Sequence, residues 1–137
     1  MAEIKRMDHI GIVVPDRDAA VELFRRLLMI EPSYREVVET SKVELIFFEL
    51  GEVQIELLVP LCSDSEMSAF LEQTGGGLHH ICYEVSSIDE VLDGLKKQGF
   101  KLIDQKPRPG SRNTLIAFVD TLEAIGCYTE YCEYRKN

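Results

Sequence analysis

The segment Asp8-His9-Ile10-Gly11-Ile12-Val13-Val14 is matched 71 residues later by His79-His80-Ile81-Cys82-Tyr83-Glu84-Val85. In both segments a histidine at the second position precedes a run rich in strand-forming residues, and an amphipathic stretch follows. Later in each half, Gln54-Ile55-Glu56-Leu57 has a counterpart in Tyr128-Thr129-Glu130-Tyr131. This internal duplication predicts a fold built from two repeats of one structural motif.

The duplication places one imidazole early and one carboxylate late in each half. Taken singly, a histidine on a strand is more often a core or surface residue than a ligand, and a glutamate beside leucine often faces solvent. Recurrence of both residue types reverses this expectation, because random placement rarely satisfies position and chemistry twice. Two imidazoles and two carboxylates suit a divalent transition ion. The predicted metal ligands are His9, Glu56, His80 and Glu130.

Length and composition predict one domain spanning residues 1–137, with 45% apolar residues, enough to fold unaided. The net charge of -9 argues against nucleic acid or an anionic membrane surface as partner. No apolar run approaches the about 20 residues of a membrane-spanning helix. The segment Met1-Ala2-Glu3-Ile4-Lys5-Arg6 lacks the apolar centre of a signal peptide, so we expect a cytoplasmic protein.

The cysteines form no C-x-x-C pair, and we expect reduced, packed thiols in a reducing cytosol. They are Cys62, Cys82, Cys127 and Cys132. By strand parity, Cys82 and Cys132 share a face with His80 and Glu130, so they line the predicted site without ligating the metal.

In the first half, Asp16 caps a helix with an apolar stripe that runs to about Leu28. Strands are predicted over 10–14, 43–50 and 53–59, the last two as a hairpin about Gly51-Glu52. A short helix over about 65–72 and a glycine hinge at 75–77 follow. Charged Glu36-Val37-Val38-Glu39 is predicted as solvated surface.

The second half repeats this scheme. The capping box Ser87-Ile88-Asp89-Glu90 opens a helix that ends at Gly99. Strands are predicted over 81–85, 102–103, 114–119 and 127–132. Each half is interpreted as βαβββ, with module one over about 7–60 and module two over about 78–133. The fold class is α+β, with the modules forming a curved mixed sheet around a metal-binding cleft.

The chain resembles the vicinal oxygen chelate superfamily, and within it the methylmalonyl-CoA epimerases. The resemblance covers Met7 to Glu133. Its residues are Asp8-His9-Ile10-Gly11-Ile12-Val13-Val14-Pro15-Asp16, Ile55-Glu56-Leu57-Leu58, Gly77-Leu78-His79-His80-Ile81 and Pro107-Arg108-Pro109-Gly110. It implies as metal ligands the same four residues that the duplication selects.

The resemblance implies proton abstraction next to the thioester of methylmalonyl-CoA or a similar 2-substituted acyl-CoA. One ion per chain would stabilise the resulting enolate. Four protein ligands on an octahedral ion leave two positions for substrate, which favours cobalt, nickel or manganese, with zinc as a further candidate. Glu130 is the predicted base, with a pKa expected to be raised by its apolar setting.

Further expectations concern the substrate and the assembly. Ser111 and Arg112 are predicted to bind the anionic substrate, because their loop is the nearest positive feature to the cleft. Relatives in this superfamily are commonly dimers, so a homodimer is expected. A second proposed base of some epimerases falls at Leu45, where the nearest acid is Glu44. Strict alternation turns Glu44 away from that side unless a β-bulge brings it round.

Alternatives from other classes share parts of this pattern. A glyoxalase I-type lactoylglutathione lyase would use the same ligands on a hemithioacetal. An extradiol dioxygenase would hold iron with three protein ligands, and a binding module without activity would lack the ligand set. The segment Asp120-Thr121-Leu122-Glu123-Ala124-Ile125-Gly126 departs from the epimerase pattern beside the cleft.

Overall fold

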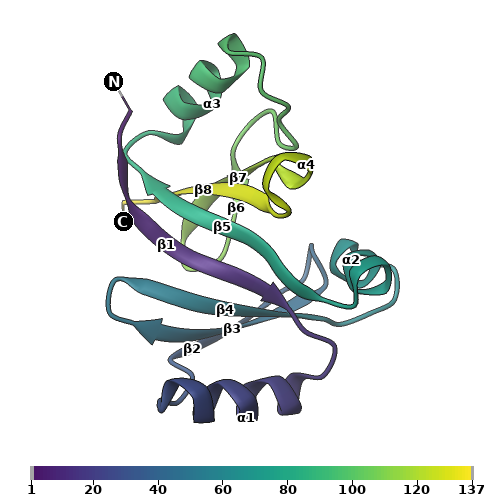
Figure 1. The fold of residues 1–137 in the computed structure, drawn as a ribbon. Coiled ribbons are helices and arrows are strands. Elements are labelled where there is room, and N and C mark those ends of the chain that lie inside the picture. Colours follow the sequence, from purple (N-terminus) through teal and green to yellow (C-terminus); the bar gives the residue numbers. More distant parts are fainter. Residues whose placement is uncertain (1, 137) are drawn as a thin grey trace. The chain divides into compact units, whose positions relative to one another are not determined.

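The computed structural model describes residues 2–136, which form eight β-strands and four α-helices (Figure 1). Along the chain these are β1 (Ile4–Val13), α1 (Arg17–Leu28), β2 (Tyr34–Val38), β3 (Val43–Leu50), β4 (Val53–Pro60), α2 (Glu66–Thr74), β5 (Gly77–Val85), α3 (Ile88–Lys97), β6 (Arg108–Pro109), β7 (Thr114–Val119), α4 (Leu122–Ile125) and β8 (Tyr128–Tyr134). Strand, helix and three strands occur on either side of α2, and in the second repeat α4 is inserted between β7 and β8. The predicted α+β class with two βαβββ modules is confirmed.

The chain forms two compact units whose borders lie inside strands. One unit contains residues 2–9 with 80–136, and the other contains Ile10–His79. Each of β1 and β5 therefore begins in one unit and ends in the other. Each unit holds the helix of one repeat together with strand residues from both repeats.

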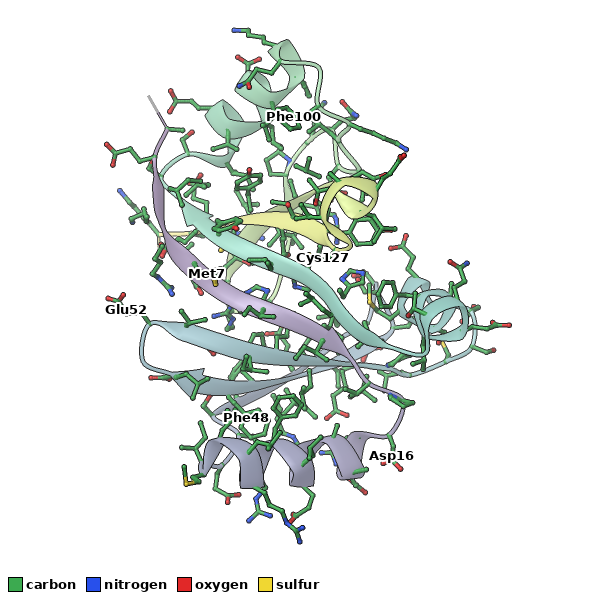
Figure 2. All side chains as sticks on the ribbon, viewed as in Figure 1. Met7, Asp16, Phe48, Glu52, Phe100 and Cys127 are labelled. Atoms are coloured by element: carbon green, nitrogen blue, oxygen red, sulfur yellow. The ribbon has the colours of Figure 1, made fainter. Side chains whose placement is uncertain are left out.

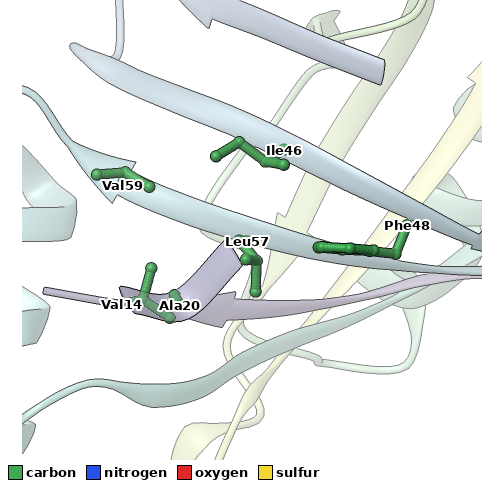
Figure 3. Close-up of a cluster of buried hydrophobic side chains, with 6 residues drawn as sticks. All are labelled: Val14, Ala20, Ile46, Phe48, Leu57 and Val59. Carbon is green, nitrogen blue, oxygen red and sulfur yellow. The ribbon is translucent and has the colours of Figure 1, made fainter. Parts of the chain in front are cut away.

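In the unit Ile10–His79 the strand order is β2-β3-β4-β1, with β2, β3 and β4 antiparallel. The Asp16 carboxylate accepts a hydrogen bond from the Ala19 amide at 3.1 Å and so begins α1. One face of the sheet packs on this helix, and Figure 2 shows Phe48 on that side. The core there consists of Val14, Ala20, Ile46, Phe48, Leu57 and Val59 (Figure 3).

The opposite face of the same sheet has its own apolar cluster, formed by Val13, Val43, Leu45, Phe47 and Leu58. Met67, Phe70 and Leu71 from α2 pack against this cluster. The two clusters use alternate residues of each strand, because successive side chains on a strand point to opposite faces. The sheet of this unit is thus packed by one helix on each face.

In the unit of residues 2–9 and 80–136 the strand order is β1-β5-β8-β7-β6. β5 and β8 are parallel while β7 is antiparallel to its neighbours, so the sheet is mixed, as predicted. The Ile88 amide donates to the Glu133 carboxylate at 2.8 Å, which satisfies a backbone donor in the first turn of α3. This helix covers one face over Val85, Ile88, Leu92, Leu102, Ala117 and Val119.

Four local elements differ from the sequence prediction. Residues 34–38 form an edge strand, because their backbone pairs with β3 in antiparallel register. The predicted strand at 102–103 is a single bridge from Leu102 to Val119, since the amides of Ile103 and Asp104 both donate to one carbonyl, that of Phe118. β6 supplies the remaining strand, and 122–125 forms α4. Across residues 2–136, every helix is too short or too polar to cross a membrane.

The glycine hinge generates a prediction about stability. Gly75 and Gly76 both have positive φ angles, of 80° and 96°. A Cβ on Gly76 would lie 2.8 Å from the Val13 carbonyl oxygen, whereas one on Gly75 would meet nothing within 4 Å. Gly75→Ala should therefore cost only backbone strain, about 1–2 kcal/mol. Gly76→Ala should lower the free energy of unfolding by a further 1–3 kcal/mol or so, measured by urea denaturation. Equal losses in the two variants would contradict the steric argument.

Candidate metal centre

His9 on β1 and His80 on β5 meet within the unit of residues 2–9 and 80–136. Their Nε2 atoms lie 3.0 Å apart. The two rings are nearly perpendicular, with an interplanar angle of 87°. Both side chains are buried, at 4% and 2% exposure. The pairing predicted from residues 71 positions apart in the sequence therefore exists as a direct contact.

Glu130 on β8 joins the two histidines. Its Oε1 atom lies 3.0 Å from His9 Nε2 and 3.2 Å from His80 Nε2. The parallel register of β5 and β8 sets Glu130 beside Cys82, two residues beyond His80. Three of the four predicted ligands are thus gathered in one buried place.

The pKa of Glu130 differs from the sequence prediction. Burial raises this pKa, but the charges and hydrogen bonds of His80 and His9 outweigh burial and hold the pKa below the ordinary value of a glutamate. The expectation of a raised pKa was wrong because it considered the apolar neighbours on the strand and not the imidazoles from β1 and β5.

The donor spacing provides a test of whether a metal ion fits. Ligand atoms at about 2.0–2.2 Å from one ion lie about 2.8–3.1 Å apart at right angles and about 3.3–3.6 Å apart at tetrahedral angles. Two of the three separations here, both 3.0 Å, fall in the right-angle range, and the third, 3.2 Å, lies between the ranges. Two imidazole nitrogens and a carboxylate oxygen are also a donor set that a transition ion prefers. The residues present fit a divalent metal ion.

The fourth predicted ligand, Glu56, belongs to the unit Ile10–His79. It lies on β4 opposite Phe47 of β3, and it is buried at 4% exposure. By alternation it shares the face of Leu45 and Leu58, away from α1. A carboxylate in such apolar surroundings is expensive to bury without a compensating positive charge. Its assignment as a ligand stays a prediction.

Behind His9 lies a buried carboxylate that sequence reasoning missed. Asp8 has no exposed surface, and its Oδ2 atom accepts a hydrogen bond from His9 Nδ1 at 2.6 Å. Burial raises the pKa of Asp8, but hydrogen bonds from His9, Tyr134 and Arg112 hold it well below its usual range. The available signal was an aspartate directly before a candidate ligand, within a strand rich in apolar residues.

The structure places Arg112 against this carboxylate. Its guanidinium donates to Asp8 Oδ2 at 2.5 Å and to the Tyr134 hydroxyl at 2.7 Å. The Arg112 side chain is only 13% exposed. The carbonyl of Ser111 closes the loop by accepting hydrogen bonds from the Thr114 amide and hydroxyl. A substrate contact from Ser111 and Arg112 stays a prediction.

Glu44 lies on the opposite face of β3 from Leu45. Its carboxylate accepts a hydrogen bond from Arg17 Nε on α1 at 2.9 Å. The pairing of β3 with β4 runs from Val43 to Leu50 without a bulge. Strict alternation is therefore kept, and Glu44 points toward α1.

Other residues of the β5–β8–β7 sheet surround the histidines. Phe118 lies opposite Glu130 in the register, and its ring meets the His80 ring edge-on at 5.3 Å between centroids. Burial raises the pKa of the Cys82 thiol well above its usual value. The four cysteines form no disulfide, as expected, and three of them are packed in the core, whereas Cys62 is partly exposed.

Comparison with known proteins identifies the class. Residues 8–118 match the family model of the glyoxalase/bleomycin resistance protein/dioxygenase superfamily. The chain belongs to this superfamily, which confirms the resemblance seen in its sequence.

Individual relatives are more specific. The chain is 39% identical to the uncharacterized protein YqjC of Bacillus subtilis, over 95% of this chain and 93% of that one. It is 36% identical to an ethylmalonyl-CoA/methylmalonyl-CoA epimerase of Cereibacter sphaeroides, over 93% and 96% of the two chains. The structure of a variant methylmalonyl-CoA epimerase from Streptomyces coelicolor, in complex with 2-nitronate-propionyl-CoA, superposes with a TM-score of 0.89 at 30% identity, covering 96% of both chains. These likenesses confirm the predicted epimerase-like enzyme.

Thiol reactivity checks the burial of this sheet. Cys62 is partly exposed, whereas Cys82, Cys127 and Cys132 are buried. Because only an accessible thiolate reacts, native protein should show about one fast thiol per chain with a colorimetric disulfide reagent, and all four after denaturation. Cys62→Ser should abolish the fast phase. A fast phase that survives this substitution would show that one of the three buried cysteines becomes exposed to solvent.

Proposed function

We propose that this protein epimerises methylmalonyl-CoA, or a similar 2-substituted acyl-CoA thioester, with the help of one divalent metal ion. The observation that carries the proposal is the buried convergence of His9, His80 and Glu130. The epimerases among its relatives support the substrate class, because they match nearly the whole chain.

The proposed ligands are His9, Glu56, His80 and Glu130. Glu56 is included because it occupies in the first repeat the place of Glu130 in the second, and because it is likewise buried. Cobalt, nickel or manganese is proposed before zinc, since four protein ligands on an octahedral ion leave two positions for substrate oxygens. Bound there, the ion would polarise the thioester carbonyl and stabilise the negative charge that develops when the substrate is deprotonated.

Glu130 is proposed as the catalytic base. The C–H bond at carbon 2 breaks, its proton goes to a carboxylate oxygen of Glu130, and its electron pair moves into the thioester carbonyl. His9 and His80 both contact the Oε1 atom of Glu130 and so fix the position of this oxygen. A proton returned to the opposite face of carbon 2 gives the epimer. Glu44 is not proposed as its donor, because that side chain is paired with Arg17 on the α1 side.

Three further parts of the proposal come from the sequence. Ser111 and Arg112 are proposed to contact the anionic substrate, which needs a local positive charge on a chain of net charge -9. A homodimer and a cytoplasmic location are proposed from the resemblance and from the sequence. A glyoxalase I-type lyase is the alternative, favoured by the breadth of the family model.

Metal binding is the first test. Titration of metal-free protein with Co²⁺ in a calorimeter should give about one ion per chain. His9→Ala or His80→Ala should weaken binding by a factor of about 10–100 or more, since each removes a ligand. His79→Ala is the matched control, because that ring packs against Phe70. Undiminished binding in a His9→Ala/His80→Ala double variant would contradict the site.

The second test concerns the base. Glu130→Gln keeps an oxygen donor but removes basicity, so hydrogen–deuterium exchange at carbon 2 of methylmalonyl-CoA, followed by NMR, should slow by about 10²–10⁴-fold. Glu44→Gln, on the α1 side of β3, should leave the exchange rate unchanged. A parallel assay with a glutathione hemithioacetal separates the lyase from the epimerase. Unchanged epimerisation in Glu130→Gln would refute the proposed base.

A further inference from the structure

We propose that Asp8 is a positioning residue of the metal centre, which orients His9 toward the ion and is itself held by Arg112 and Tyr134. The inference rests on the proposed metal site. Arg112 and its loop would then influence the reaction through Asp8 and the metal ligand His9.

The contact with Asp8 orients the ring of His9. A neutral imidazole has one N–H donor and one nitrogen lone pair. An ionised carboxylate can only accept, so the 2.6 Å contact with Asp8 Oδ2 places the His9 proton on Nδ1. Arg112 Nη2 also lies 3.3 Å from His9 Nδ1, but the shorter contact with Asp8 decides the tautomer. The lone pair is then on Nε2, the atom that faces His80 Nε2 and Glu130 Oε1. A ligating histidine is commonly held by a carboxylate in this manner.

Hydrogen bonds from neighbouring side chains hold the Asp8 carboxylate in place. Its Oδ1 atom accepts from the Tyr134 hydroxyl at 2.6 Å and from Arg6 Nη2 at 2.9 Å. Its Oδ2 atom accepts from His9 and from Arg112 Nη2 at 2.5 Å. Four donors on two oxygens determine both the position and the plane of the carboxylate. Two guanidinium groups also compensate the cost of burying its charge.

Arg112, which contacts Asp8, lies in the loop over residues 110–113. A Cβ on Gly110 would lie 2.6 Å from Ile116 Cγ2 and 2.8 Å from the Thr114 hydroxyl oxygen, so this position admits only glycine without rearrangement. Arg112 adopts a left-handed φ of 54° in the turn that follows. The turn sends the guanidinium inward to Asp8, and Arg112 also bonds to Tyr134 of β8. Loop, β1 and β8 therefore meet at one carboxylate.

Of the two repeated histidines, only His9 is preceded by an aspartate. The residue equivalent to Asp8 in the second repeat is His79, which packs against Phe70 with 4.8 Å between ring centroids. The carboxylate of Asp8 therefore has no counterpart in the second repeat, and it lies where Arg112 and Tyr134 contact it.

The test compares Asp8→Asn, Tyr134→Phe and Glu133→Gln with the unaltered protein. Asp8→Asn should weaken Co²⁺ binding by about 10–100-fold, as loss of an outer carboxylate typically does. Tyr134→Phe removes one neutral hydrogen-bond donor and should weaken binding by about two- to tenfold. Glu133→Gln is the matched control, because Glu133 caps α3 and its substitution affects stability without touching Asp8.

A second readout does not depend on metal or on activity. Proton–nitrogen correlation NMR of the metal-free protein should show His9 protonated at Nδ1, and Asp8→Asn should shift this ring toward the other tautomer. A merely structural role would lower the melting temperature and leave the tautomer and the affinity of the folded protein unchanged.

The outcomes separate the inference from the proposed function. Unaltered protein that binds no metal would refute the proposed metal site and, with it, the role of Asp8. Tight metal binding with unchanged affinity and tautomer in Asp8→Asn would overturn the inference alone. If Asp8→Asn does not fold, unchanged affinity and tautomer in Tyr134→Phe would overturn it.

Discussion

The meeting of His9, His80 and Glu130 is the interaction on which the rest of their unit depends. Two imidazole nitrogens 3.0 Å apart repel each other if both present lone pairs, so a proton or a cation must lie between them. The buried Glu130 carboxylate beside them requires a positive partner as well. Neighbouring strands β1, β5 and β8 bring the three groups together. The register of β5 with β8 places Glu130 opposite Cys82, two residues beyond His80. The mixed sheet thus keeps the two imidazoles and the carboxylate in contact, although each of them needs a charged or hydrogen-bonding partner.

Strand alternation lets each unit bury polar residues without interrupting its core. Ile46 and Phe48 pack toward α1, while Phe47, opposite Glu56, lies on the other face. In the other unit Ala117 and Val119 pack with α3, while Phe118 lies opposite Glu130 and against His80. The direction of Glu44 follows from the same rule, because β3 has no bulge to reverse it. Helix packing and site chemistry are therefore separated by residue parity.

Much of this could be predicted from the residues. The repeated His and Glu pairs identified three side chains that the structure brings into contact, and the helices at 17–28 and 88–97 follow their capping residues and apolar stripes. The misplaced elements have weak local signals. β2 is a charged edge strand whose regular backbone comes from pairing with β3. After Leu102 the backbone amides of two residues donate to the carbonyl of Phe118, a partner that is distant in sequence.

The sequence by itself determined the duplication, the α+β class, the parity of each face and the identity of the candidate donors. These depend on short-range periodicity and on residue chemistry. Only the tertiary structure decided what surrounds the charged groups. It placed two imidazoles beside Glu130, which reversed the expected direction of its pKa, and it turned Arg112 inward to Asp8. The physical reason is that the ionisation and orientation of a buried group are set by nearby charges and hydrogen-bond partners, and here those partners come from strands and loops far apart in the chain.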